Sequence, residues 1–138
     1  MSTENQFTIE LATPSVETYR RLRSAARLSA KTEEAAILGL NGTLFAVQVL
    51  SGNEPIGMGR VIGDGGCFYQ VVDIAVLPEH QGKGLGKRIM KEIMKFIALS
   101  VPQSAYVSLI ADGKAQDLYA QFGFKYTAPA SVGMAIKV

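Results

Sequence analysis

Residues 81–86 read Gln81-Gly82-Lys83-Gly84-Leu85-Gly86, and this glycine-rich stretch decides the fold of the chain. It lies between an apolar run at residues 71–77 and a basic amphipathic segment that begins at Leu85. Together these features predict a strand, a tight turn and a helix. Because glycine lacks a Cβ atom, the turn can direct several backbone N–H groups at one point, where the helix N-terminus adds positive potential. The stretch therefore predicts a site for a ligand that carries phosphates.

Alternating and β-branched runs predict the strands around this turn. We expect them at residues 7–11, 43–50, 55–62, 67–77 and 105–110, with two short strands at 124–127 and 132–138. Since a helix separates the strands at 67–77 and 105–110, these two should pair in parallel through a right-handed crossover.

Four segments carry helical spacing or capping signals. We expect a first helix that starts at Thr13-Pro14 with threonine as its cap, and a second that spans residues 32–40. A third should run from Leu85 to about residue 101, and a fourth should follow Asp112 as its cap. In the first helix, Arg20, Arg21, Arg23 and Arg27 should face solvent. The sequence thus predicts a mixed, mostly antiparallel α/β (α+β) fold of about six to seven strands and about four helices.

The chain has 138 residues, of which 48% are hydrophobic and 19% charged, a balance that predicts one domain over residues 1–138. No long apolar run or secretory leader is evident, so we expect a soluble, cytoplasmic protein that does not bind membranes. A single cysteine, Cys67, and a single histidine, His80, argue against a disulfide and a metal site. The net charge of +2 is too small to indicate nucleic acid.

Two common phosphate-binding motifs do not fit the glycine turn. A Walker loop needs a first glycine and a final hydroxyl residue, but Gln81 and Arg88 occupy those positions. A dinucleotide fingerprint needs a third glycine and a later acidic residue, and neither is present at the required distance. Nucleotide hydrolysis and hydride transfer are therefore disfavoured.

The remaining pattern is Gln81, two residues, Gly84, one residue and Gly86, placed between a strand and an amphipathic helix. This pattern resembles the acetyl-CoA motif of the GNAT acetyltransferase family, which occupies the same junction. Residues 73–76 before the turn and residues 118–124 beyond the next strand match the family as well. The resemblance covers most of the chain and implies a GNAT-like domain whose sheet is splayed at its central parallel pair.

By this resemblance, the chain binds acetyl-CoA as cosubstrate and needs no metal. The CoA pyrophosphate should lie on backbone N–H groups of the glycine turn, and the pantetheine arm should pair with the preceding strand. Asp112 stands where many relatives carry an asparagine that contacts the CoA arm. The implied binding set is Ile74, Ala75, Val76, Gln81, Gly82, Lys83, Gly84, Leu85, Gly86, Lys87 and Asp112. A tight turn without a ligand is the alternative interpretation.

Two residues are candidates for the chemistry. Tyr119 matches the family's tyrosine that protonates the departing thiolate, although its helical spacing also fits a core tyrosine. Asp73 lies in an apolar strand, where burial of a carboxylate is costly, so we expect this group to be paired or to have a function. It matches an acidic position that receives or relays the amine proton, and a structural ion pair with Arg60 is the other interpretation. In a regular strand, Tyr69 and Asp73 share one face, whereas a bulge would separate them.

The resemblance implies an N-acetyltransferase that moves the acetyl group to a primary amine of a small molecule or peptide by direct attack in a ternary complex. A non-catalytic module that senses CoA and regulates a partner protein is the alternative. A homodimer built on a C-terminal strand is left open. The sequence does not identify the amine acceptor.

Overall fold

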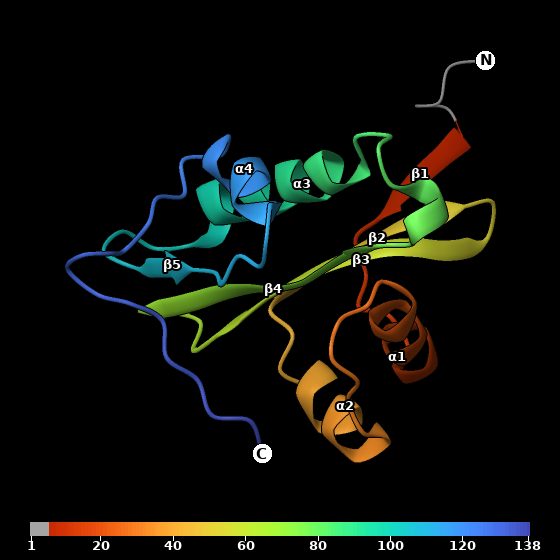
Figure 1. Ribbon diagram of the computed structural model, residues 1–138, viewed down its shortest axis with the longest axis horizontal. Coiled ribbons are helices and arrows are strands. Elements are labelled where there is room, and N and C mark those ends of the chain that lie inside the picture. Colours follow the sequence, from red (N-terminus) through yellow and green to blue (C-terminus); the bar gives the residue numbers. More distant parts are fainter. Residues whose placement is uncertain (1–5) are drawn as a thin grey trace.

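The computed structural model describes residues 6–138, so residues 1–5 of the predicted domain lie outside the described part (Figure 1). Its strands are β1 (Phe7–Glu10), β2 (Phe45–Ser51), β3 (Glu54–Gly63), β4 (Phe68–Val76) and β5 (Tyr106–Ser108), which follow one another across a single sheet. Neighbours from β1 to β4 are antiparallel, and β4 and β5 are parallel. The predicted mixed, mostly antiparallel sheet is confirmed, with five strands instead of six to seven.

The helices cover both faces of the sheet. Helices α1 (Val16–Ala25) and α2 (Glu33–Leu40) lie below it in Figure 1, whereas α3 (Leu85–Ser100) and α4 (Ala115–Ala120) lie above. A single 3₁₀ turn, η2 (Pro78–His80), joins β4 to the glycine turn. The core forms where α3 buries Leu85, Ile89, Met90 and Ile93 against the sheet, because apolar residues spaced by three and four share one helix face.

Two predicted helix caps are wrong. The hydroxyl of Ser15, not Thr13, accepts a hydrogen bond from the Thr18 N–H at 3.1 Å, because α1 begins two residues later than expected. Helix α4 has Lys114 at its N-cap and no capping side chain, so Asp112 does not cap it. The predicted start of α2 is confirmed, with Thr32 as its cap.

The parallel pair is splayed. Strand β5 pairs with β4 only at Phe68, Tyr69 and Gln70, while β4 continues to Val76. Within residues 6–138, the second half of β4 has no partner strand along this edge. The backbone of residues 71–76 therefore borders an opening beside β5, the last strand of the sheet.

A β-bulge interrupts β4 at the edge of this opening. Val72 pairs with Arg60 and Ala75 pairs with Met58, so Asp73 and Ile74 both oppose Gly59. Asp73 adopts a left-handed conformation, with φ of 60°. Of the two alternatives, the bulge is the one present, and it separates the two side chains: the Tyr69 ring packs edge-on against Phe96 of α3, whereas Asp73 turns toward α1.

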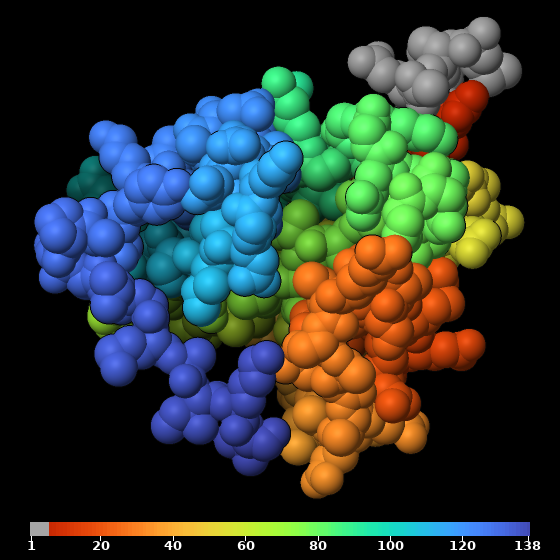
Figure 2. Space-filling model, viewed as in Figure 1, coloured from red at the N-terminus to blue at the C-terminus, as the bar shows by residue number. Residues whose placement is uncertain are grey.

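The two predicted C-terminal strands are also wrong, since residues 124–138 contain no strand. A strand needs a ladder partner, and within the described part of the chain this tail has none. Figure 2 shows the tail, in dark blue, on the surface of the molecule. Its apolar side chains at every second position are exposed: Val132 67%, Met134 90%, Ile136 91%.

Candidate active site

The glycine turn leaves the start of α3 open. Gly82 and Gly84 have φ of 81° and 76°, and a Cβ atom added at either would meet no atom within 4 Å. Gly84 is the N-cap of α3, so no side chain caps the helix, and its first turn holds no acidic residue. The first backbone N–H groups of a helix lack partners within it. The turn therefore offers donors and positive potential to an anion.

Contacts on either side hold this turn in place. The Gln81 amide Nε2 donates to the Val76 carbonyl at 3.0 Å, which joins the turn to the end of β4. A Cβ atom on Gly86 would lie 3.3 Å from Leu118 Cδ2, so α3 and α4 approach closely there. Leu85 is buried in the core, so only its backbone can reach a ligand. The side chains of Lys83 and Lys87 are exposed.

One polar atom near the turn is unsatisfied. Among residues 6–138, Nη1 of Arg88 is the only buried side-chain nitrogen or oxygen atom without a hydrogen-bond partner. Arg88 lies in the first turn of α3, directly after the glycine turn. Guanidinium groups bind phosphate oxygens well, and an unpaired buried donor is costly. The open backbone at the start of α3 fits a diphosphate group, and Arg88 is a further phosphate-binding residue type in the same helix turn.

A cleft of about 700 Å³ lies between the two helix layers. Five residues predicted from the sequence line it together: Asp73, Ile74, Gln81, Asp112 and Tyr119. Ala75, Val76 and residues 82–87 lie outside this lining. Ile74, Ala75 and Val76 do lie in the half of β4 that extends beyond β5, as a pairing with an extended ligand requires.

Asp73 forms a buried network on the α1 side of the cleft. Its Oδ1 accepts hydrogen bonds from Arg23 Nη1 and, at 3.0 Å, from the Tyr19 hydroxyl. Its Oδ2 accepts from Arg60 Nε at 2.8 Å, so the ion pair with Arg60 is present. The Asp73 side chain is only 5% exposed. Burial raises the pKa of the Tyr19 hydroxyl above its ordinary value, and the charge of Asp73 adds to this effect.

The solvent-facing position predicted for Arg23 is wrong, because Arg23 is 8% exposed. Its Nε and Nη2 bind the carbonyl and hydroxyl of Ser29 at 2.9 and 3.0 Å. Arg23 and Tyr19 are four residues apart, so they share one face of α1. This spacing, combined with a carboxylate inside an apolar strand, is the signal that could have identified Arg23. Sequence reasoning also missed Tyr19 and Lys31 as cleft residues.

Tyr119 lies on α4 at the opposite wall of the cleft. It is 8% exposed, and its ring packs edge-on against Phe124 with centroids 6.5 Å apart. Burial raises the pKa of Tyr119 above its ordinary value, and the nearby charge of Asp112 raises it further. The hydroxyl therefore keeps its proton at neutral pH, as a proton donor must.

Comparisons with known proteins match the sequence to one family and the fold to solved structures. The family described as acetyltransferase (GNAT) domain matches residues 40–126. A structure of a protein of unknown function from methicillin-resistant Staphylococcus aureus, described as a probable acetyltransferase, is 49% identical, with a TM-score of 0.91 over 96% of this chain and 99% of that one. A GNAT family acetyltransferase from Streptococcus pneumoniae is 25% identical, with a TM-score of 0.76 over 96% of this chain and 97% of that one.

Among curated proteins, the chloroplastic GCN5-related N-acetyltransferase 2 of Arabidopsis thaliana is 34% identical over 79 residues, which are 57% of this chain. The chain covers 30% of the length of that relative. None of the helices within residues 6–138 has the length and apolar character that crossing a membrane requires.

Proposed function

Because the chain belongs to the acetyltransferase (GNAT) family, we propose that it transfers an acetyl group from acetyl-CoA to a primary amine of a small molecule or peptide. One observation carries this proposal. A single cleft brings Tyr119, Asp73 and Gln81 together, between an open helix N-terminus and the unpaired edge of β4. Such an arrangement has room for a phosphate group, an extended arm and a reacting amine.

The backbone N–H groups from Gln81 to Lys87 would hold the pyrophosphate, with Arg88 as an additional donor. Each charge-assisted backbone bond contributes roughly 1.5–3 kcal/mol. The β4 edge at residues 74–76 would pair with the pantetheine arm, and Asp112 would border it. When bound, acetyl-CoA supplies a thioester whose carbonyl carbon bonds to the amine nitrogen while the bond from carbon to sulfur breaks.

Tyr119 acts as the proton donor in this proposal. Tyr119 lines the cleft and its hydroxyl stays protonated, so it can deliver a proton to the departing sulfur. The amine loses one proton as it becomes an amide, and that proton passes to solvent. Solvent then reprotonates Tyr119, so the overall products are the N-acetyl amine and free CoA thiol.

We propose that Asp73 is a positioning residue. Its side chain is only 5% exposed and its oxygens accept hydrogen bonds from Tyr19, Arg23 and Arg60, so an amine has little access to this carboxylate. Its carboxylate instead holds the two guanidinium groups and the Tyr19 hydroxyl at the cleft wall. Water takes the amine proton.

The release of free CoA thiol from acetyl-CoA, measured with a panel of primary amines, tests this function. We expect release that depends on the amine and saturates with its concentration. Tight binding of acetyl-CoA in calorimetry without amine-dependent release would instead favour the non-catalytic sensor. Acetyl-CoA incubated without an amine gives the background rate.

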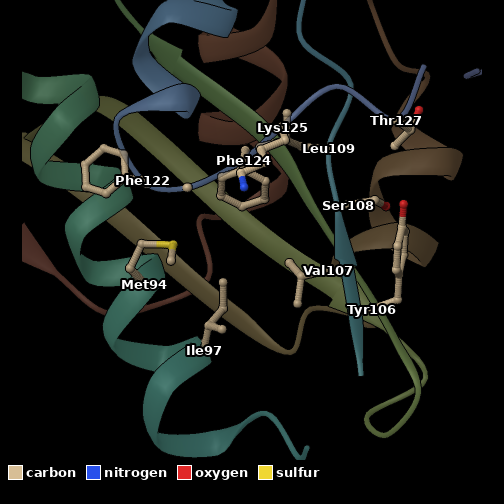
Figure 3. A pocket seen from close by; sticks show the side chains of 11 residues that line it. Met94, Ile97, Tyr106, Val107, Ser108, Leu109, Phe122, Phe124, Lys125 and Thr127 are labelled. Carbon is tan, nitrogen blue, oxygen red and sulfur yellow. The ribbon is translucent and has the colours of Figure 1, made fainter. Parts of the chain in front are cut away.

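We further propose that two copies of the chain associate through the C-terminal tail, residues 131–138. Strand β5 is the last strand of the sheet, and an apolar cleft of about 350 Å³ lies beside it (Figure 3). Phe122, Phe124, Met94, Ile97 and Val107 line this cleft. The alternating exposed residues of the tail suit a strand that pairs with a sheet edge in another copy.

Light scattering coupled to size exclusion tests this assembly. We expect the native chain to be a dimer and the double variant Met134→Lys/Ile136→Lys to be a monomer that keeps the native circular dichroism spectrum. A monomeric native chain would overturn the proposal, because the tail would then have no second copy to pair with.

A further inference from the structure

We propose that the acetyl acceptor carries an anionic group, a carboxylate or a phosphate, which binds to Arg60 and Lys31 at the α2 end of the cleft while its amine lies near Tyr119. This proposal rests on the proposed acetyltransferase function and specifies the class of its acceptor. It follows from the charges that line the cleft and from the donors that the protein leaves free.

The buried network has an excess of positive charge. Arg23 and Arg60 are 8% and 6% exposed, and both pair with the single carboxylate of Asp73. Two cations and one anion leave a net charge of +1 in a site that is largely removed from water. A desolvated charge is costly unless it is paired. An anion that enters the cleft would complete the pairing.

Arg60 has a donor available for such an anion. Its Nε binds Asp73, and its Nη1 binds the Thr43 hydroxyl at 2.6 Å and the Gly39 carbonyl at 3.4 Å. Within residues 6–138, no hydrogen bond engages Nη2 of Arg60, and this atom is not sealed from solvent, although the guanidinium lies over the Tyr19 ring with Cζ 5.3 Å from the ring centroid. The guanidinium of Arg23, by contrast, is engaged at all three nitrogens. Within the described residues, the guanidinium donor left without a hydrogen bond in this cluster is therefore Nη2 of Arg60.

Lys31 lies at the same end of the cleft. Arg60 and Lys31 line both the main cleft and an adjoining cavity of about 260 Å³ against α2. The Lys31 side chain is exposed, and its carbonyl accepts a hydrogen bond from Arg20 Nε, which fixes the backbone at this position. A guanidinium from β3 and an ammonium from the α1–α2 loop thus border one space. Paired cationic donors of this kind suit carboxylate and phosphate oxygens.

The opposite wall has the opposite charge. The charged side chains that line the cleft are Arg23, Lys31, Arg60, Asp73 and Asp112. Asp73 is already paired, so Asp112 is the free carboxylate, and its charge acts on the Tyr119 hydroxyl. An ammonium group should therefore settle near Tyr119 and an anion near Arg60. The cleft is polarised to orient a molecule that carries both.

This anion site is separate from the proposed pyrophosphate site. Residues 82–87 of the glycine turn do not line the cleft, whereas Arg60 and Lys31 do. Phosphates bound at the start of α3 would therefore leave the α2 end of the cleft free for the acceptor.

Matched pairs of primary amines test the inference. In each pair one member ends in an anion and the other in a neutral group: 4-aminobutyrate against 4-aminobutyramide, which has a similar size, and O-phosphoethanolamine against ethanolamine, which lacks the phosphate. We expect at least one anionic member to have a kcat/KM at least about ten-fold above that of its neutral partner, a difference of about 1.4 kcal/mol. The carboxylate and phosphate pairs distinguish the two kinds of anion.

The variant Lys31→Gln should reduce this preference several-fold, through a lower kcat/KM for the anionic members. Lys91→Gln, which removes an exposed lysine on α3 away from the cleft, is the matched control. It should change neither the preference for anionic amines nor the kcat/KM for neutral amines. Calorimetry of the same pairs on the protein with CoA gives a readout that does not need turnover. Equal binding of the anionic and neutral members would overturn the inference. Selective binding of the anionic members without any acetylation would uphold the anion site at Arg60 and Lys31 and contradict the proposed function.

Discussion

The guanidinium of Arg60 and the carboxylate of Asp73 face each other across a β-bulge, with Arg60 Nε donating to Asp73 Oδ2 at 2.8 Å. The bulge adds one residue to β4 and turns Asp73 toward α1, where Arg23 also reaches it. A carboxylate that would otherwise face α3 thereby becomes part of the cleft wall. The polar side of the cleft depends on this bulge in β4.

Removal of the carboxylate should destabilise the fold. Asp73→Ala leaves the guanidinium groups of Arg23 and Arg60 buried without their anion, so we expect the free energy of unfolding to fall by about 3–5 kcal/mol. Urea denaturation measures this change. Asp117→Ala, which removes an exposed carboxylate from α4, should cost no more than about 1 kcal/mol. Similar losses in the two variants would contradict the role of Asp73 in the network.

The bulge should also depend on a small residue at position 59. A Cβ atom on Gly59 would lie 2.6 Å from Ile89 Cγ2 and 2.7 Å from Ile74 Cδ1. We expect Gly59→Ala to reduce the free energy of unfolding by about 1–3 kcal/mol through overpacking. Gly39→Ala in α2 is the control, because its Cβ would meet no atom within 4 Å and the helix should gain about 0.5–1 kcal/mol. An unchanged free energy of unfolding in Gly59→Ala would contradict this expectation and show that α3 can move away from the sheet.

The variant Tyr119→Phe distinguishes proton donation by the Tyr119 hydroxyl from packing of its ring. This variant keeps the ring against Phe124 and removes only the hydroxyl. General acid catalysis typically contributes about 10²–10⁴-fold, so we expect kcat to fall by roughly 100-fold or more while the Kd for acetyl-CoA and the Tm stay close to the native values. A lower Tm with an unchanged kcat would instead identify Tyr119 as a core residue only.

The pH dependence of kcat should reflect the raised pKa of Tyr119. Burial, and then the charge of Asp112, hold this pKa above 10.0. The hydroxyl therefore stays protonated below pH 10.0, and its contributions to turnover and stability are lost only as the pH rises through the higher folded value. In Asp112→Asn the loss of turnover should begin at lower pH, yet still above the ordinary tyrosine value, since burial remains. A tyrosine-dependent decline with its midpoint below 10.0 in the native protein is the contrary result.

The regular parts of this fold could be predicted from the sequence. Helix α3 and the β2–β3 hairpin follow local periodicity and turn residues, so the glycine turn was placed correctly at the junction of β4 and α3. The family resemblance added Tyr119, Asp73 and Asp112, and the structure brings these three side chains to one cleft.

Other features depend on contacts between distant residues. Arg23 was expected in solvent because local spacing does not show that a bulge 50 residues later would present Asp73 to it. The tail was expected to form strands because residues 132–138 alternate, but alternation specifies only which side chains share a face. A strand also needs a ladder partner, which the described part of this chain does not supply.

The central claim is that backbone geometry at the glycine turn binds acetyl-CoA, and calorimetric titration of acetyl-CoA into Gly84→Val tests it most directly. Valine at φ of 76° strains the turn and fills the open space over it, so we expect the Kd to rise by more than about ten-fold. Gly52→Val places the same residue at φ of 61° in the β2–β3 turn and should leave the Kd unchanged. Lys91→Ala, which removes one exposed charge, should raise it by no more than about five-fold. Equal losses in Gly84→Val and Lys91→Ala would contradict the account.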